Sequence, residues 1–151
     1  MKIAEKRGQY RKQINVHLAD IEKAVDALTY SRDKCRTIDQ LNENDLEVME
    51  SFEALAARFA RASDLLTQKV LKSLFIILQE EAPTLIDRVN FLAKLNIIPS
   101  ADTLLNIQEI RNQIAHEYVT DDIKSLYQDI IDYTPGLIET IHHLKNFIQK
   151  L

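Results

Sequence analysis

Four residues in the second half of the chain have types and spacing suited to chemistry at a phosphate group. Asn112 follows Arg111 directly, His116 lies five residues after Arg111, and Tyr118 lies two residues further on. The planar guanidinium of an arginine binds phosphate oxygens through several N–H donors. A histidine can move a proton because its ordinary pKa lies near neutrality. Arg111 and His116 could therefore cleave a phosphodiester without a metal ion, with Asn112 orienting His116, bonding the phosphate or simply facing solvent.

The same segment has the periodicity of an amphipathic helix. At about 100° per residue, Arg111 falls within the apolar arc of the helix and Tyr118 shares its face. Asn112 and His116 fall on the opposite, polar arc. The apolar arc contains Leu104, Ile107, Ile110 and Ile114. We therefore expect Arg111 to be partly buried, and His116 to point in another direction.

A guanidinium on an apolar stripe requires a partner. Burying it unpaired is costly, so Arg111 should meet a carboxylate, a phosphate or a solvent-filled groove at an interface. One helix does not aim Arg111 and His116 at the same point, but a second copy of the helix could complete the arrangement. The pattern favours a two-fold homodimer with a composite cleft. The alternative is a purely structural pair at a dimer interface.

The motif also carries a family resemblance. Arg111-x4-His116-x-Tyr118, with the polar Asn112 after the arginine, resembles the signature of the HEPN superfamily, specifically that of HepT-like ribonuclease toxins. The likeness of layout covers residues 8–145, while only the motif is specific. It implies a homodimer whose Arg111 and His116 line one cleft and cleave RNA without metal or cofactor. It also implies a minimal nucleotidyltransferase antitoxin that attaches AMP to Tyr118.

Other readings of the motif stay open. A noncatalytic subunit could use the same helix to dock a nucleotidyltransferase and present a substrate to it. A helical adaptor could use the motif only as a dimer interface. Tyr118 could be an ordinary amphipathic aromatic residue at a helix end.

The remaining polar candidates are weaker. The neighbours His142 and His143 point in different directions on a helix, and together with His17 they lack the spacing of a metal site. Arg61 and Asp64 could form a polar contact that approaches the helix of Arg111, although most such pairs are surface ion pairs. Arg88 could contact a phosphate, but a solvated helix face is the simpler interpretation.

Composition favours an all-α fold in a single domain spanning residues 1–151. Two glycines and three prolines among 151 residues leave little turn chemistry for a sandwich, a barrel or a glycine-rich phosphate loop. The single cysteine, Cys35, excludes a disulfide framework and is typical of a reducing compartment, which predicts a cytoplasmic protein. No apolar run is long enough for a membrane span. We expect five or six helices packed as one antiparallel bundle.

Periodicity and capping residues predict where the helices lie. We expect a helix over about residues 8–30, with the apolar stripe Ile14, Leu18, Ile21, Val25 and Leu28, followed by a loop over 31–44. Helical sequence over 45–81 follows and is capped by Asn44 or Asp45. We expect a bend or break in it near Ser63–Asp64, and its most buried part at 65–78. Thr84 caps a short helix that ends before Pro99, Ser100 caps the helix of the motif, and Thr120–Asp121–Asp122 open the next one. Thr134–Pro135 predicts the start of a last helix, or a kink.

Charge is unevenly distributed along the chain. The net charge is −4, but residues 1–12 carry +4 and the remainder −8. The basic segment could contact phosphates, although a solvated helix end is the plainer interpretation. The acidic remainder gives no support to strong nonspecific binding of nucleic acid.

Overall fold

The computed structural model describes residues 2–116 and 122–151, and these residues are helical with no strand. The all-α prediction is confirmed. The elements are α1 (Ile3–Arg36), α2 (Leu46–Asp64), η1 (Leu65–Val70), α3 (Leu71–Leu78), α4 (Leu85–Lys94), α5 (Ala101–Ala115) and α6 (Ile123–Gln149). Because α2, η1 and α3 follow one another without a gap, the described residues form five helical rods.

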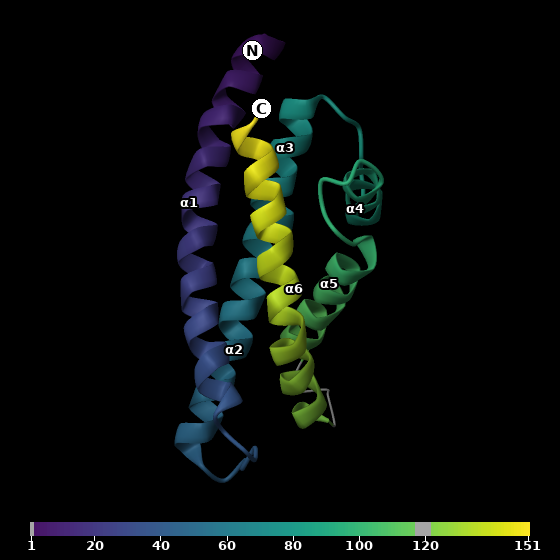
Figure 1. The fold of residues 1–151 in the computed structure, drawn as a ribbon. Helices are drawn as coiled ribbons and strands as arrows, with labels where there is room; N and C mark the ends of the chain where they lie inside the picture. The colour runs from purple at the N-terminus through teal and green to yellow at the C-terminus, as the bar shows by residue number, and fades with distance from the viewer. Residues whose placement is uncertain (1, 117–121) are drawn as a thin grey trace.

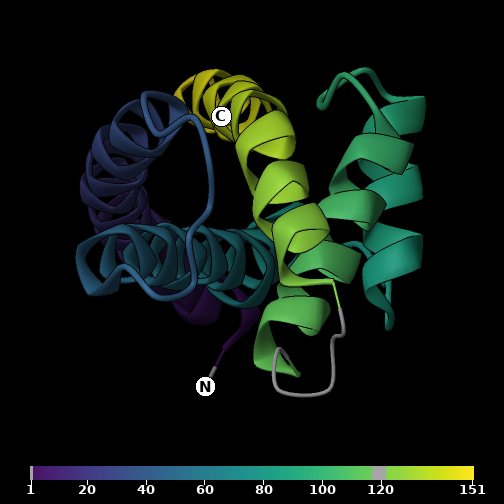
Figure 2. The same ribbon diagram turned by 90° about the horizontal axis from the view of Figure 1, so that it is seen from below.

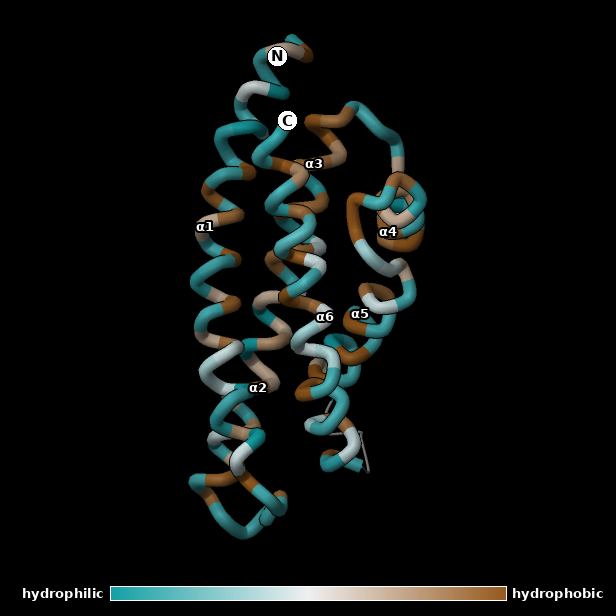
Figure 3. Tube along the Cα trace, viewed as in Figure 1, coloured by the Kyte–Doolittle hydropathy of each residue, from teal (hydrophilic) through white to brown (hydrophobic). Residues whose placement is uncertain are grey.

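Three long rods make up the body of the bundle. α1 lies beside the α2–η1–α3 rod and beside α6, and runs antiparallel to both (Figure 1). α5 packs obliquely against α2 and α6, and α4 packs on α5 at the outer side (Figure 2). Buried apolar side chains from all of these elements form one core. Apolar segments dominate α3 and recur along α1 (Figure 3). Among the described residues, no helix is long and apolar enough to cross a membrane.

The first helix is longer than its apolar stripe predicted. Four residues of the stripe are buried and Val25 is half-buried, but the helix spans Ile3–Arg36 and not about 8–30. The predicted loop over 31–44 was wrong in its first part, because Ser31 and Cys35 continue the stripe at spacings of three and four and are both buried. Small and polar residues here occupy core positions, so polar composition alone misplaced the helix end.

The second rod keeps its direction where a break was expected. Asp45 caps α2 by accepting hydrogen bonds from the backbone N–H groups of Glu47 and Val48, as predicted. At Leu65 the helix widens into the π-helix η1 and then continues as α3. A rod of this length fits because the equally long α1 packs along it. The predicted buried segment is confirmed, with Leu66, Leu71, Leu74 and Ile77 at most 2% exposed.

The caps of the two middle helices are confirmed. The hydroxyl of Thr84 accepts a hydrogen bond from the N–H of Asp87 at the start of α4, and that of Ser100 accepts one from the N–H of Thr103 at the start of α5. A Cβ added at Gly136 of α6 would lie 2.9 Å from Cγ2 of Thr103, so glycine permits a close approach of α6 to α5. Ser100 and Gly136 thus help to fix the helix that carries Arg111.

Pro135 lies inside α6 and does not begin a new helix. α6 runs without interruption from Ile123 to Gln149, and Thr134 donates its hydroxyl to the carbonyl of Ile130 at 2.6 Å and does not act as a cap. Proline has no N–H for the carbonyl of Ile131, one turn earlier. Nε of Arg32 in α1 donates to that carbonyl at 3.0 Å. The long-range bond from Arg32 therefore replaces the helical hydrogen bond that Pro135 cannot donate. Asp122 caps the start of α6, while Thr120 and Asp121 lie outside the described residues.

Candidate functional site

Arg111 is held by a carboxylate from another helix. Its Nε donates to Oδ1 of Asp64 at 2.7 Å and its Nη2 donates to Oδ2 at 3.0 Å, so the pair is bidentate. The two side chains are 28% and 31% exposed. Of the three partners expected for Arg111, the structure shows the carboxylate. The contact between Asp64 and the helix of Arg111 is confirmed, while Arg61 is exposed.

The local fold places Asp64 at a change of helical type. Asp64 is the last residue of α2, and the wider turn of η1 begins at the next residue. One extra residue per turn changes the angular register of the side chains, and such turns are frequent at functional sites. Leu66 and Val70 stay in the core beyond it, while Asp64 remains near the surface facing α5. A π-helical turn thus begins next to Ser63–Asp64, where a bend or break was predicted, and the helix continues through it.

The electrostatics keep Arg111 cationic. The hydrogen bonds that Arg111 donates to Asp64 raise the pKa of Arg111, the Coulomb attraction of the same carboxylate raises it further, and burial opposes both. Asp64 engages Nε and Nη2 and does not engage Nη1. A guanidinium carries five N–H donors, so it can hold a carboxylate on one edge and a second anion on another. The pair thus presents an oriented cation at a partly exposed surface.

His116 and Asn112 lie apart from the Asp64 pair. His116 is the C-cap of α5, where its backbone N–H bonds to the carbonyl of Gln113, and its side chain is exposed. Asn112 is exposed one turn earlier, and its Oδ1 accepts from Nε2 of Gln108 at 3.4 Å. Within one chain, Arg111 faces α2 while His116 is at the exposed end of α5. Because the helix ends before His116, the helical wheel does not place this side chain, and the divergence of the two residues stays a prediction.

Tyr118 lies outside the described residues. α5 ends at Ala115, and His116 has the non-helical backbone angles φ −115° and ψ 28°. The helical wheel that placed Tyr118 on the face of Arg111 assumed that the helix continued to Tyr118. That placement therefore no longer has a basis, and the role of Tyr118 stays a prediction from the motif.

The other polar candidates have structural partners. His143 lies 3.8 Å from a carboxylate oxygen of Glu139 on the exposed face of α6. Arg88 is not on a solvated face, because its Nε donates to the carbonyl of Ala82 at 3.0 Å and its guanidinium lies 5.7 Å from the ring centre of Phe75. Among residues 2–116 and 122–151, no three His, Cys, Asp or Glu side chains gather as metal ligands would.

Comparisons with known proteins identify no family for this chain. No family model matches the sequence, and no curated protein matches it. The functional argument therefore depends on the geometry of Arg111 and Asp64 and on the resemblance of the motif that ends at Tyr118.

Proposed function

We propose that the chain is a metal-independent endoribonuclease, the toxin of a toxin–antitoxin pair of the HepT type. The bidentate pair of Asp64 and Arg111 is the observation that carries the proposal. It fixes an arginine of the motif in a definite orientation at a partly exposed surface, five residues before His116, the C-cap of the same helix. Arginine and histidine at a helix end are the two groups that metal-free cleavage needs.

The chemistry assigns a separate task to each side chain. The 2′-hydroxyl of RNA attacks the neighbouring phosphorus, so a proton must leave that oxygen and the 5′-oxygen of the leaving strand must gain one. His116 moves protons, and the Arg111 donors that Asp64 does not use stabilise the charge on the phosphorus oxygens. Asp64 acts through Arg111 and is a positioning residue. Asn112 supports the site by bonding the phosphate, because its amide N–H groups are donors.

A second copy of the chain would complete this site. The helical periodicity predicts that Arg111 and His116 diverge within one protomer. A shallow hollow of about 370 Å³ includes Asp64 and is lined by Ala57, Ala60 and Leu65 together with Arg61, Gln68 and Lys69. The two alanines let helices of two protomers approach closely. We propose a two-fold homodimer in which Arg111 of one protomer and His116 of the other share a cleft.

The assembly is tested by sedimentation. Equilibrium runs at micromolar concentration should give a mass twice the 17.5 kDa of the chain. Replacing Ala57 by arginine at the hollow should shift the mass towards that of the monomer, whereas the same change at Ala4 in the exposed first turn of α1 should leave it unchanged. A parental protein that sediments as a monomer would contradict the composite cleft.

The reaction itself is tested with the purified chain and total RNA in EDTA. We expect new 5′-hydroxyl ends and 2′,3′-cyclic phosphate ends, because the attack comes from the 2′-hydroxyl, and we expect the rate to be unaffected by the chelator. Inhibition by EDTA would contradict the mechanism. Absence of cleavage, with the chain still binding a minimal nucleotidyltransferase, would replace the proposal with the noncatalytic subunit.

A further inference from the structure

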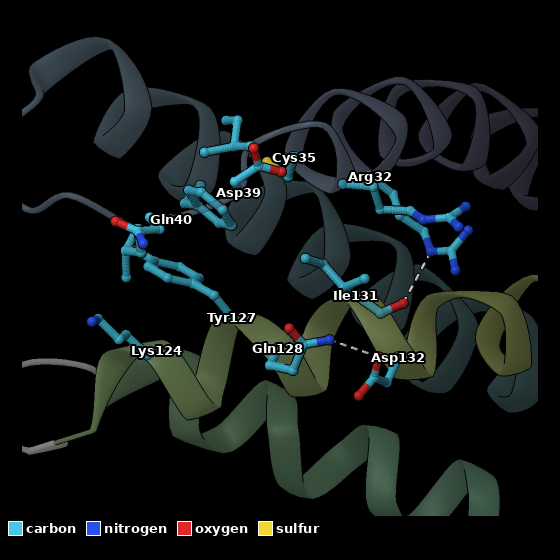
Figure 4. Close-up of a pocket in the computed structure, with 13 residues that line it drawn as sticks. Arg32, Cys35, Asp39, Gln40, Lys124, Tyr127, Gln128, Ile131 and Asp132 are labelled. Atoms are coloured by element: carbon cyan, nitrogen blue, oxygen red, sulfur yellow. Dashed lines mark hydrogen bonds between the residues drawn. The ribbon is translucent and has the colours of Figure 1, made fainter.

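A polar hollow of about 690 Å³ lies away from Arg111, between the end of α1, the loop over 37–45 and the first turns of α6 (Figure 4). Arg111, Asp64 and His116 are not among the residues that line it. Its volume is in the range of small-molecule binding sites. The polar residues used below are Arg32, Arg36, Asp39, Lys124, Gln128 and Asp132.

One wall of the hollow carries an arginine that the fold holds in place. Pro135 leaves the carbonyl of Ile131 without its helical N–H, and Nε of Arg32 donates to that carbonyl at 3.0 Å. The bond fixes the guanidinium through Nε, which leaves its Nη donors outside this contact. Arg36 follows one helical turn later on α1 and also lines the hollow. Figure 4 shows Arg32 at one side of the hollow and Lys124 of α6 at the other.

The charge of the lining selects an anion that also carries hydroxyl groups. Three cationic side chains and two carboxylates line the hollow, which gives a positive excess in a chain whose net charge is −4. Nε2 of Gln128 donates to Oδ1 of Asp132 at 2.9 Å, so this carboxylate is oriented. Carboxylates accept hydrogen bonds from sugar hydroxyls, while arginine and lysine bind phosphate oxygens.

Two largely buried aromatic rings lie under the hollow, Phe52 at 5% and Tyr127 at 2% exposed, so a base would be bound mainly through its polar edge. Phe52 and Tyr127 pack with ring centres 5.0 Å apart, and both line the hollow. The amide of Gln40 lies near Tyr127 in Figure 4 and can donate to and accept from the polar edge of a base, whereas the amide of Gln128 bonds to Asp132. Cations, hydroxyl acceptors and an amide above these two rings match the parts of one nucleotide.

We propose that this hollow binds a nucleoside phosphate. The phosphate lies on Arg32 and Arg36 at one side of the hollow, Lys124 at the other side adds positive charge over a longer range, and the ribose hydroxyls donate to Asp39 or Asp132. The ligand is a free nucleotide or one unit of an RNA strand, which share this chemistry. The site does not depend on the ribonuclease activity proposed above, because none of the residues assigned to that activity lines the hollow.

The test measures binding to the full-length chain in two arms, equilibrium dialysis with labelled AMP and fluorescence anisotropy with a labelled RNA tetranucleotide. The double variant Arg36→Gln/Lys124→Gln should weaken binding at least about tenfold, since one lost charge-assisted bond contributes about 1.5–3 kcal/mol. Both residues are exposed, so the variant should fold. Arg32 is left intact because it satisfies the carbonyl of Ile131.

The control is Lys23→Gln/Lys94→Gln, which removes the same charge at exposed positions outside the lining. Its binding should match that of the parent. NMR shifts caused by AMP should gather at residues 32–40 and 124–128 and not at 108–116. Saturable binding of AMP assigns a free nucleotide, and saturable binding of the tetranucleotide alone assigns an RNA unit. No saturable binding in either arm, or equal loss in the control, would overturn the proposal.

Discussion

Replacing Arg111 or His116 by alanine is expected to lower the rate of RNA cleavage at least about 100-fold. Removing one donor to the charge that develops in the transition state costs about 10²–10³ in rate, and removing a general acid or base costs about 10²–10⁴. Arg111→Lys should be nearly as inactive, because an ammonium cannot hold Asp64 and a phosphate on two edges of one plane. Initial rates on purified variants, with helical content checked by circular dichroism, measure the effect.

Matched variants separate chemistry from folding. His142→Ala removes an exposed histidine of α6 and should retain parental activity, which makes it the control for His116→Ala. A variant of Arg111 or His116 that cleaves RNA near the parental rate would contradict the assigned roles. The same variants should stop inhibiting growth when expressed, for the same reason.

The Asp64 pair provides a graded test of positioning. Asp64→Asn removes one acceptor and the negative charge, so Arg111 loses its fixed orientation while its charge remains. We expect kcat to fall less than in Arg111→Ala, and Asp64→Glu to restore part of it. The free energy of unfolding should change by about 1 kcal/mol or less, because both side chains are close to one-third exposed. A loss of stability with unchanged kcat would make the pair purely structural.

The second large effect expected is silencing of cleavage through Tyr118. Under the resemblance to HepT-like toxins, a cognate nucleotidyltransferase transfers AMP from a nucleotide to the hydroxyl of Tyr118, with release of pyrophosphate if the donor is ATP. Tyr118 follows His116 by two residues in the chain, so the new phosphate and nucleoside would lie close to the histidine along the sequence. The phosphate would attract the Arg111 guanidinium, and the nucleoside would exclude RNA from the cleft.

Mass spectrometry after co-expression with the nucleotidyltransferase measures this modification. The peptide containing Tyr118 should gain one or more AMP masses, and cleavage should fall to background. Tyr118→Phe should escape modification and remain toxic beside the partner. The control Tyr133→Phe, which replaces a different tyrosine on α6, should be silenced normally. If Tyr118→Phe is also neutralised, the antitoxin acts by occlusion and Tyr118 has no regulatory role.

Local features of the sequence determined most of the helical architecture. Asp45, Thr84 and Ser100 each bond an N–H two or three residues away, so the signal and the structure lie within one turn of the chain. Spacings of three and four likewise predicted the buried faces. The end of the first helix was mispredicted because Ser31 and Cys35, which are not typical core residues, fill core positions. The start of a last helix at Thr134–Pro135 was mispredicted because a helix cap and a buried helix interior have the same local sequence there.

Only the tertiary structure decided which partners the charged residues have. The wheel required a partner for Arg111, and the sequence offered Asp64 only as one possible contact, because Asp64 lies 47 positions away and only packing shows that the two side chains meet. Arg32 bonds the Ile131 carbonyl across 99 positions, and the hollow beside it exists because α1, the 37–45 loop and α6 converge. The physical reason is range: caps and apolar stripes act over a few residues, whereas ion pairs and cavities depend on how whole helices pack.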